Sequence, residues 1–574
     1  MAKGKNSVVF ILTQLCLVAA ASLLFTASFP NIIFKNGLPF LAWFAYIPIL
    51  ILIKKNYLLQ CIGWGAVYGV LTYFLFNNWL WGFNNIAGAV VYTIYLFFMA
   101  VVFLFLKLAE YFYPKKGYLV QWIIFLAYEY LCTKGFLGYP YGITGYSQWT
   151  VLPLIQIAGI TGVWGVSALV TFPSFWLAAP IRRLADEIKK YNDYSKNTLN
   201  LKKRKTFKII KNILRVSVAE FLKEEKIPAI IWAAAMAASL IFGFINIKDY
   251  SSNPSVQVAL IQHNTDPWEA SNAPNQWLQQ EAFKLDLSRL KHLSDQALLS
   301  TPKPQLIVWP ETAFIPRIYW HSTYRTDQNL WLIVKDLLDY LSAKDVPFLI
   351  GNDDARKEPD KNPDDYDNNR VDYNGALLME NGQISRVYRK MHLVPFTEHF
   401  PYRKQIPFIY NALLKADTHF WEKGEEAVVF KTEGFNFSVP ICFEDTFGYI
   451  SREFTRQGAD VFINISNDAW AASLPSQKQH LGMAVFRTIE NNRSMVRATT
   501  SGQTCLIDPN GRILSEAAPF TETYLNVAVP LADGNTIYTR FGDFLGISLS
   551  FMAFILLLSP IIWYTIMKLI RGSK

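Results

Sequence analysis

The 574 residues are long enough for more than one domain, and 52% of them are hydrophobic whereas only 17% are charged. So little charge is unusual for a soluble protein, and the apolar excess lies in long runs before about residue 247 and after about residue 543. The formal net charge of +10 could indicate nucleic acid binding, but the basic residues lie mostly beside apolar runs, so we expect a membrane protein without a nucleic acid partner.

The cysteine and histidine patterns indicate neither a disulfide framework nor a metal site. The five cysteines are odd in number and lack zinc-type spacing, and the seven histidines form no pair at ligand spacing. We therefore predict no metal and no cofactor.

About eight apolar runs approach the roughly 20 residues that a membrane-spanning helix needs. The first could be a signal peptide, but six further runs before residue 248 favour a retained helix. The second and fifth runs are short. The runs are Val8–Ser28, Leu38–Ile53, Leu58–Leu80, Ile86–Leu108, Tyr118–Cys132, Leu152–Ala179, Ile227–Ile245 and Phe544–Met567.

Positive charges assign one orientation to these runs. Lysines at positions 3 and 5 place the N-terminus in the cytoplasm, and counting spans forward places Lys54, Lys55 and the basic stretch 181–226 on the same side. The last run also ends in basic residues. We predict a multi-pass membrane protein with helices 1–7 in residues 1–247, a domain outside the cytoplasm in residues 248–542, and helix 8 with a cytoplasmic tail in residues 543–574. In a double-membraned bacterium the membrane would be the inner one and the domain would be periplasmic.

Two features of the membrane half permit alternative interpretations. Glu129 lies in an apolar run, where an ionisable group is costly and often functional, but it could also lie near an interface, capped by tyrosines. The loop 135–148 is rich in Gly and Tyr and could form either a substrate mouth or an ordinary turn.

Residues 248–542 have the pattern of a layered α/β fold, in which chemistry is expected at strand ends. Asp353–Asp372 is acidic and poor in apolar residues, and we interpret it as a solvated loop or hairpin tip. The expected strands are Val256–Gln262, Gln305–Trp309, Phe348–Gly351, Asn374–Glu380, Phe437–Ile441 and Val461–Ser466, and the expected helices are Gln276–Leu299, Leu330–Ala343 and Gln477–Asn492.

Reactive side chains follow three of the β-rich runs. Glu311 ends one, Lys390 follows another ahead of Glu398, and Cys442 ends a third beside Glu444. Taken singly, each has an ordinary explanation, because a lone Cys after an apolar strand is usually a small core residue and a lone Glu or Lys is usually at the surface. Together, in the order Glu, Lys, Cys, they form a catalytic constellation.

The three groups have complementary roles in nucleophilic catalysis. A thiol with a pKa of about 8.5 is mostly protonated at neutral pH and needs a base, which Glu311 would supply. Lys390 would stabilise the oxyanion that forms when the Cys442 thiolate attacks a carbonyl, helped by the backbone N–H of Phe443. The two further glutamates are expected to orient the lysine and tune the pKa values of the site.

These residues resemble the Glu–Lys–Cys triad of the nitrilase, or carbon–nitrogen hydrolase, superfamily, whose fold is an αββα sandwich. The wider pattern looks like the apolipoprotein N-acyltransferase family over about residues 255–530, with seven helices before that domain and one after it. The motifs that carry the likeness are Lys390–Glu398, Ser466–Trp470, Gln479-His480, Arg497–Thr499 with Gly502, and Asp508–Gly511.

The resemblance implies a polytopic α-helical membrane domain joined to a nitrilase-like αββα catalytic domain, with the triad on Glu311, Lys390 and Cys442. Phe443 stands where many members have tyrosine, so any hydroxyl role is lost there. The other implied site residues are Glu398, Phe443 and Glu444 as accessory or oxyanion groups, and Trp470 and Trp268 as substrate-binding groups.

The implied reaction moves the sn-1 acyl chain of a phospholipid, through a Cys thioester, to the N-terminal amine of a diacylglyceryl-cysteine apolipoprotein. A site at the bilayer avoids extracting lipid chains, which costs about 0.8 kcal/mol per CH₂. We expect a monomer. Because two bulky substrates must enter in turn, we expect mobile loops at Pro401–Trp421 and Trp470–Gln477.

Two other functions are compatible with parts of this pattern. A membrane-tethered amidase or nitrilase would share the triad, although one helix would suffice as its tether. A transporter with a non-catalytic sensor domain would share the helices, but the intact triad and the scarcity of charge within the spans argue against it. The first alternative differs from acyl transfer in whether water or an amine accepts the acyl group.

Overall fold

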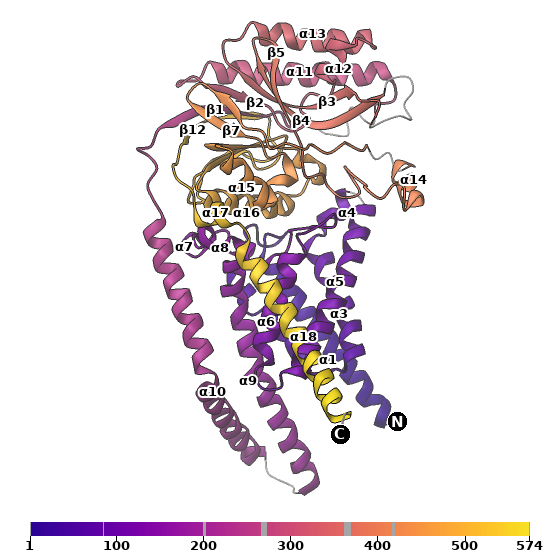
Figure 1. Cartoon of the computed structure of the whole chain (residues 1–574), viewed down its shortest axis with the longest axis vertical. Helices are drawn as coiled ribbons and strands as arrows, with labels where there is room; N and C mark the ends of the chain where they lie inside the picture. The colour runs from indigo at the N-terminus through magenta and orange to yellow at the C-terminus, as the bar shows by residue number, and fades with distance from the viewer. Residues whose placement is uncertain are drawn as a thin grey trace.

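A helical bundle forms one end of the molecule and a layered α/β domain forms the other (Figure 1). The computed structural model describes residues 2–83, 85–198, 203–265, 273–360, 369–415 and 419–572. The N- and C-terminal ends both lie at the end of the bundle remote from the α/β domain (Figure 1).

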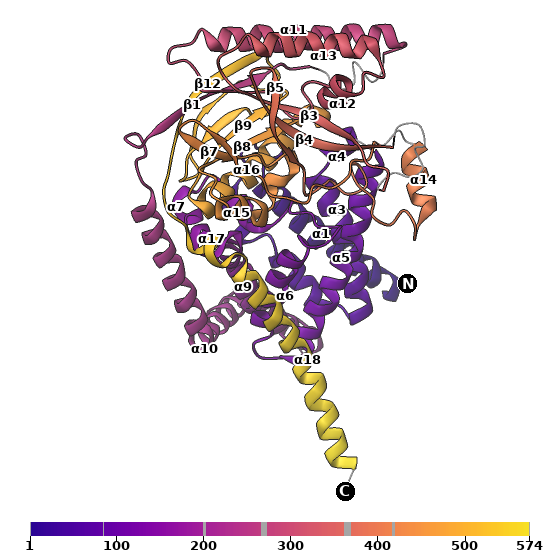
Figure 2. The same cartoon turned by 45° about the horizontal axis from the view of Figure 1, so that its top comes forward.

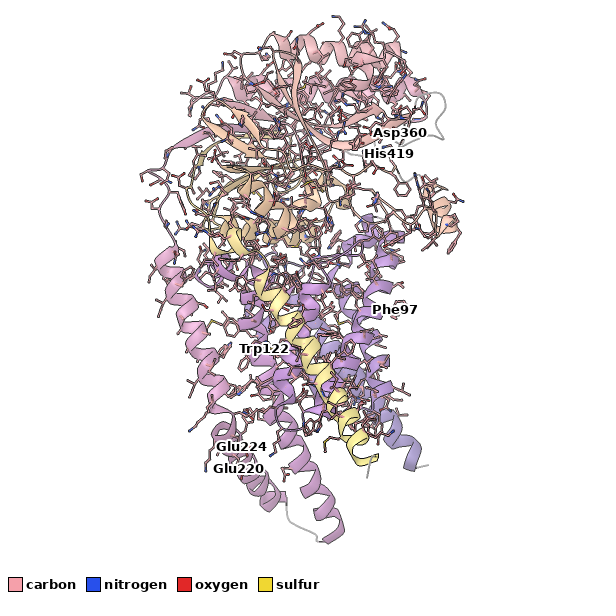
Figure 3. The ribbon with its side chains drawn as sticks, viewed as in Figure 1. Phe97, Trp122, Glu220, Glu224, Asp360 and His419 are labelled. Atoms are coloured by element: carbon pink, nitrogen blue, oxygen red, sulfur yellow. The ribbon has the colours of Figure 1, made fainter. Side chains whose placement is uncertain are left out.

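Within the described residues, six helices are long and apolar enough to cross a membrane. A helix suits this setting because it satisfies its own backbone hydrogen bonds. Phe97, which is 62% exposed, points outward from the bundle (Figure 3), as expected for a lipid-facing side chain. The apolar spans are Val8–Ser28 in α1 (Ala2–Ser28), α3 (Leu58–Phe76), Ala87–Phe112 in α5 (Asn85–Phe112), Val163–Ile181 in α9 (Val163–Thr198), Lys223–Asn246 in α10 (Lys203–Asn246) and Phe544–Leu569 in α18 (Phe544–Gly572).

The two short predicted spans are short helices packed within the bundle. The second is a 3₁₀ turn, η1 (Pro39–Trp43), followed by the nine-residue α2 (Ile47–Lys55). The fifth is α6 (Gly117–Leu131), whose 15 residues cover only about 22 Å. Both contribute buried side chains to the core that they share with the longer helices.

The predicted span Leu152–Ala179 is wrong in its first part. The chain there forms two short helices, α7 (Leu152–Ile155) and α8 (Ala158–Thr161), and then turns at Gly162 with a φ of 64°. A Cβ atom at Gly162 would lie 2.7 Å from the Tyr538 ring, so glycine is required on both counts. The spanning part of α9 therefore begins only at Val163.

The α/β domain contains two six-stranded sheets whose central strands are parallel. The carboxyl ends of these parallel strands meet at one edge of each sheet, which gathers the loops that follow them. The first sheet has the order β12-β1-β2-β3-β4-β5, with β1 (Ser255–Gln262), β2 (Leu306–Val308), β3 (Phe348–Lys357), β4 (Arg370–Glu380), β5 (Gln383–Arg389) and β12 (Thr523–Pro530); the second has the order β11-β10-β9-β8-β7-β6, with β6 (Phe430–Thr432), β7 (Phe435–Ser438), β8 (Val461–Ser466), β9 (Ser494–Thr499), β10 (Cys505–Ile507) and β11 (Ile513–Glu516).

The two sheets pack face to face between helical layers, which confirms the αββα sandwich. Alternate residues of the first sheet divide between two cores: Val258 and Leu260 face the second sheet, whereas Ala259 and Ile261 face the helices outside. The outer helices are α11 (Gln276–Leu298) and α13 (Gln328–Ser342), seen above the first sheet in Figure 2, while α15 (Gly448–Arg456) and α16 (Leu474–Asn491) lie between the second sheet and the bundle.

The interpretation of Asp353–Asp372 as a solvated loop or hairpin tip is correct in that the segment joins two antiparallel strands, and wrong for Asp354 and Asp372, which are buried. Strands β3 and β4 extend into it and pair as far as Lys357 and Arg370. Asp354 is fully buried and Asp372 nearly so, because arginines distant in sequence pair with them: Arg389 Nη2 lies 2.8 Å from Asp354 and Arg317 Nη2 lies 2.8 Å from Asp372. Residues 361–368 lie outside the described part.

The remaining short helices connect these layers. They are α4 (Trp79–Phe83), η2 (Thr144–Gln148), α12 (Ile318–Thr323), α14 (Pro407–Lys415), η3 (Cys442–Thr446), η4 (Asp468–Ala471) and α17 (Ile537–Phe541).

A buried ion pair on α16 joins the α/β domain to the bundle. Arg487 Nη2 donates to Glu490 Oε1 at 2.9 Å and to the Tyr146 hydroxyl of η2 at 3.0 Å, and both charged side chains are 1% exposed. Glu490 Oε1 also accepts from the backbone N–H of Val163 at the start of α9. This pair therefore fixes α16 against two elements of the bundle.

We predict that Arg487→Met destabilises the full-length protein by about 3–5 kcal/mol, because it leaves Glu490 buried without a cation. The melting temperature in detergent should fall clearly, and the double variant Arg487→Met with Glu490→Gln should recover much of the loss because it removes the unpaired charge. Equal melting temperatures for Arg487→Met and wild type would contradict this docking role.

Candidate active site

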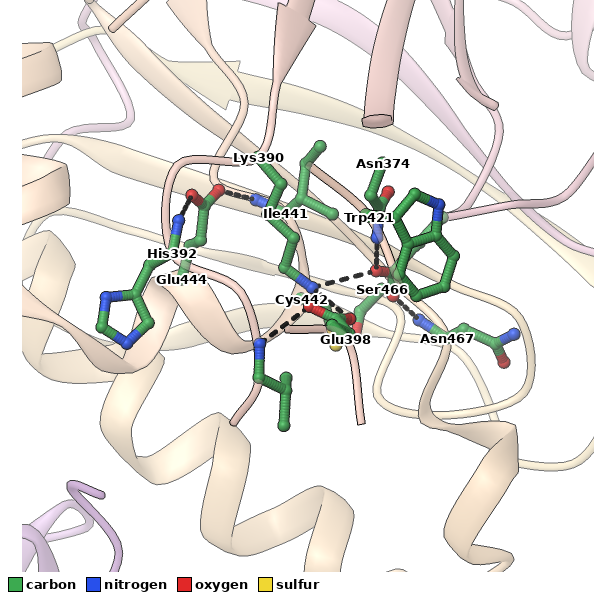
Figure 4. A network of polar contacts seen from close by, with 12 residues as sticks. Asn374, Lys390, His392, Glu398, Trp421, Ile441, Cys442, Glu444, Ser466 and Asn467 are labelled. Carbon is green, nitrogen blue, oxygen red and sulfur yellow. Dashed lines mark hydrogen bonds and ion pairs between the residues drawn. The ribbon is translucent and has the colours of Figure 1, made fainter. Parts of the chain in front are cut away.

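Glu311 lies in the loop after β2, at the carboxyl edge of the first sheet, and is 5% exposed. Its Oε1 accepts from Asn374 Nδ2 at 2.8 Å and lies 3.3 Å from Lys390 Nζ. Its Oε2 accepts from the backbone N–H of Asn467 at 2.9 Å, in the loop after β8. Three partners, one within β4, one directly after β5 and one after β8, thus hold this carboxylate in one orientation (Figure 4).

Lys390 directly follows β5 and is fully buried between two carboxylates. Its Nζ lies 2.8 Å from Glu398 Oε1 and 3.3 Å from Glu311 Oε1. Burial opposes the charged form, but Glu398 and Glu311 outweigh it and hold the pKa of Lys390 above its ordinary value. The site therefore keeps a permanent ammonium group, and the expectation that Glu398 orients Lys390 agrees with this contact.

Cys442 begins η3, just beyond β7, with a φ of 50°. Such a backbone conformation is strained for a non-glycine residue and is common at functional sites. Burial and the charge of Glu311 raise the pKa of the Cys442 thiol to about 12, against the opposing effects of Lys390 and His480. The resting side chain is therefore a neutral thiol that needs a base, and Figure 4 shows it beside the Lys390–Glu398 pair.

Glu444 joins the Cys442 turn to the Lys390 segment through backbone groups. Its Oε1 accepts from the N–H groups of Met391 at 2.7 Å and His392 at 3.0 Å, and its Oε2 accepts from the N–H of Ile441 at 2.8 Å. Burial raises its pKa to about 7, although these N–H donors favour the charged form. Glu444 thus positions the lysine through the neighbouring backbone, rather than by contact with its ammonium group.

The membrane half supplies aromatic residues to the same site. The Phe443 ring stacks with Tyr141 at a centroid distance of 6.5 Å, and Tyr139 stacks with Tyr141 at 4.8 Å. Glu129 anchors the loop that carries both tyrosines, since its Oε1 accepts from the Thr144 N–H at 2.8 Å. The loop 135–148 is therefore part of the site wall, and Glu129 is a buried anchor for it.

A second charged cluster lies under the Cys442 turn, and the sequence pattern gave its members no individual role. His480 Nε2 lies 2.6 Å from Asp445 Oδ1 and 3.3 Å from the Cys442 carbonyl oxygen, and His480 Nδ1 lies 3.2 Å from Asp468 Oδ1. Arg497 forms ion pairs with both aspartates. Burial opposes the imidazolium, but neighbouring acidic groups, with Tyr141 and Asp468 foremost, raise the pKa of His480 to about 10.

The expected substrate-binding tryptophans and loops have mixed outcomes. Trp268 lies outside the described residues, and only the backbone of Trp470 is described, in η4. The segment Trp470–Gln477 is mostly helical rather than a loop, because α16 begins at Leu474, and 401–421 contains α14. Trp421, which the sequence pattern did not single out, is drawn among the site residues in Figure 4. Its backbone N–H donates to the Glu398 carbonyl at 2.9 Å, and its indole N–H donates to Asp353 at 2.9 Å.

One group of potential metal ligands occurs in the described part of the chain. Single ligand atoms of Asp353, Asp372 and His419 lie within 4.8 Å of one another. Arg317 already lies 2.8 Å from Asp372 and 3.7 Å from Asp353, so a guanidinium supplies the positive charge there. The residues present do not favour an added cation, and we assign no metal role to them.

Two family models match different parts of the chain. The model for carbon–nitrogen hydrolases matches residues 257–537, and the model for the N-terminal domain of apolipoprotein N-acyltransferases matches residues 21–176. Among solved structures, the chain is similar to an amidase from Nesterenkonia sp. (TM-score 0.32, 16% identity, 48% of this chain and 91% of that chain).

Similar curated proteins span nearly the whole chain. Apolipoprotein N-acyltransferase 1 of Treponema denticola is 40% identical over 99% of each chain, and that of Treponema pallidum is 41% identical over 93% of each. Apolipoprotein N-acyltransferase of Borreliella burgdorferi is 28% identical over 92% of each chain.

The α/β domain, with its two sheets, is therefore a carbon–nitrogen hydrolase domain. Because the similarity extends through the bundle, the whole chain belongs to the apolipoprotein N-acyltransferase family. It is a membrane acyltransferase of lipoprotein biosynthesis, with several helices able to span the bilayer.

The raised pKa of His480 predicts a pH-dependent contribution to stability. A folded-state pKa of about 10, against about 6.5 when unfolded, gives a contribution that is complete below pH 6.5 and is lost as pH rises to about 10. The free energy of unfolding of wild type should therefore exceed that of His480→Gln by the largest amount at pH 6.5. Above this pH the difference should shrink by up to about 1.4 kcal/mol per pH unit. Melting curves of both proteins at pH 6.5, 8 and 9.5 measure this, and a difference independent of pH would contradict a buried imidazolium.

Proposed function

We propose that this enzyme transfers the sn-1 acyl chain of a phospholipid, through a thioester on Cys442, to the N-terminal amine of a diacylglyceryl-cysteine apolipoprotein. The observation that carries the proposal is the buried Glu311–Lys390–Glu398 cluster beside the Cys442 thiol. It provides a base, a fixed positive charge and a nucleophile in one place, which acyl transfer from an ester requires.

In the first half-reaction, Glu311 takes the proton of the Cys442 thiol as the sulfur attacks the ester carbonyl. The negative charge that develops on the carbonyl oxygen is stabilised by the Lys390 ammonium and the backbone N–H of Phe443. The ester C–O bond then breaks, and Glu311 returns its proton to the leaving oxygen, giving a lysophospholipid and a thioester.

In the second half-reaction, the neutral amine of the acceptor attacks the thioester carbonyl. Glu311 takes a proton from the attacking nitrogen, the C–S bond breaks, and Cys442 regains a proton as the amide forms. The products are a triacylated lipoprotein and the free enzyme.

The surroundings of the site suit lipid substrates. Tyr139 and Tyr141 come from the membrane half, and α14, which lies beside the domain near the end of α4 (Figure 1), exposes 72% of Phe408 and 45% of Leu414. Apolar groups exposed at this level favour contact with a bilayer surface, where donor and acceptor chains can remain embedded. We propose that the segment 401–421 moves when the two substrates exchange.

We place the α/β domain in the periplasm and both termini in the cytoplasm, with the enzyme acting as a monomer. The support for this orientation is the charge pattern. The C-terminal end of α5 and the turn before α6, which carry Lys107 and Lys115, lie towards the end of the bundle that also holds both termini, and Lys54 pairs with Glu110 of α5, which suits a cytoplasmic location.

The acyl-enzyme gives the test of this proposal. Incubating purified protein with phospholipid, without acceptor, should add the mass of one fatty acyl group to wild type, and hydroxylamine should remove it. Cys442→Ala should gain no acyl mass, and Glu311→Gln should gain it about 10²–10⁴-fold more slowly because it lacks the base.

The same experiment separates the alternatives. If no adduct forms with phospholipid but a small amide is hydrolysed in a Cys442-dependent way, the protein is a tethered amidase and the proposed donor is wrong. Lys390→Met serves as the charge control: it should fold less stably and acylate slowly, since Glu311 and Glu398 would then share a buried site without a cation.

A further inference from the structure

A cavity of about 490 Å³ lies within the bundle, well away from Cys442. It opens to the surface of the bundle and is lined by the C-terminal ends of α2 and α5, the start of α6, and α9 and α10. Figure 3 marks this level of the bundle with Glu220 and Glu224 on α10, at the end remote from the α/β domain. The charged and amide side chains that line it are Lys54, Lys107, Glu110, Lys115, Gln121 and Glu225.

Helix α10 is kinked at Glu225, where φ is −111° and ψ is 17°. Contacts of this residue hold α10 against α6 and α9. The Glu225 carboxylate accepts from the Tyr118 hydroxyl at 2.7 Å and lies 3.5 Å from Lys116 Nζ, while its carbonyl accepts from the Trp176 indole at 3.3 Å. These contacts satisfy Glu225 and define one wall of the cavity.

The cavity has an excess of positive charge. Lys54 and Lys107 share one carboxylate, Glu110, at 3.1 and 3.2 Å, and Lys107 also donates to the Ile53 carbonyl at 3.1 Å. Lys115 lies exposed in the turn before α6. Three lysines, Lys54, Lys107 and Lys115, line the cavity against two glutamates, Glu110 and Glu225. The N-terminal end of helix α6, which lines the cavity, adds the positive end of a helix dipole at the same place.

Gln121 lines this cavity and has an unsatisfied buried acceptor. The side chain is completely buried, and its Nε2 donates to the Leu106 carbonyl at 2.9 Å. Its Oε1 has no hydrogen-bond partner within the described part of the chain. Since a buried acceptor without a donor costs about 1–3 kcal/mol, a hydroxyl-bearing ligand at this position would be stabilising.

We propose that this cavity binds an anionic phospholipid of the leaflet remote from the α/β domain. The lysines bind the headgroup phosphate, and Gln121 Oε1 accepts a hydrogen bond from a headgroup hydroxyl, as a glycerol headgroup provides. Basic pockets between membrane helices are suited to such headgroups, and exposed apolar helix faces beside the cavity accommodate acyl chains. The bound lipid joins α2, α5 and α6 to α10 and so stabilises the bundle. This inference does not depend on the proposed function.

The test is native mass spectrometry of full-length protein in detergent, titrated with phosphatidylglycerol, phosphatidylcholine or soluble glycerol 1-phosphate. All proteins carry Cys442→Ala, so that no lipid is consumed and binding at the other site is common to every sample. Lys54→Gln with Lys115→Gln should weaken phosphatidylglycerol binding about tenfold and reduce its effect on melting temperature. The matched control, Lys55→Gln with Lys568→Gln, removes the same charge at positions that do not line the cavity and should bind as the parent does.

Lys115→Gln alone carries little risk of misfolding because Lys115 lies in an exposed turn. Loss of this one lysine contact should weaken phosphatidylglycerol binding several-fold. Equal binding by the cavity variants and the control overturns the proposal. So does phosphatidylcholine binding as tightly as phosphatidylglycerol, or glycerol 1-phosphate occupying the cavity as well as the lipid, which would make it a site for a soluble phosphate.

Discussion

The buried ammonium of Lys390 is the group on which the catalytic half depends. A charge without solvent is stable only when it is paired, and Glu311 and Glu398 pair it from two different loops. Because Glu311 is also held by Asn374 and the Asn467 N–H, this ion cluster ties both sheets of the sandwich together at the edge where Cys442 emerges. The same charges that stabilise the folded site are those that the proposed acyl transfer uses.

The two halves of the chain share one site rather than lying side by side. The loop after α6 brings Tyr139 and Tyr141 against Phe443, Glu129 anchors that loop, and α16 carries both the Arg487–Glu490 docking pair and His480. A soluble hydrolase needs no such arrangement. For an enzyme whose substrates stay in the bilayer, it places the thiol where lipid chains need not leave the membrane.

The positions of strands and of the reactive groups that follow them could be predicted from the sequence, because both depend on the local pattern of residues. Alternating and continuous apolar runs located β1 and β8 almost to the residue, and the reactive groups at strand ends are those that the structure gathers. Long-range pairing was not predictable: Asp354 and Asp372 read as solvent-exposed until Arg389 and Arg317 are placed beside them. Likewise, the requirement for glycine at position 162, between α8 and α9, depends on the distant Tyr538 ring. The ion cluster under Cys442 joins Asp445 to His480, which are 35 residues apart in the sequence.

Partition of the acyl group between amine and water distinguishes acyl transfer from hydrolysis. Wild-type protein loaded with a labelled acyl chain from phospholipid would be freed of donor and chased with a diacylglyceryl-cysteine peptide. If Cys442 passes the acyl group to an N-terminal amine, the label should appear as an amide on the peptide faster than as free fatty acid. An N-acetylated peptide should accept none. Release of the label mainly as fatty acid, at a rate independent of the peptide, would contradict acyl transfer and favour a hydrolase.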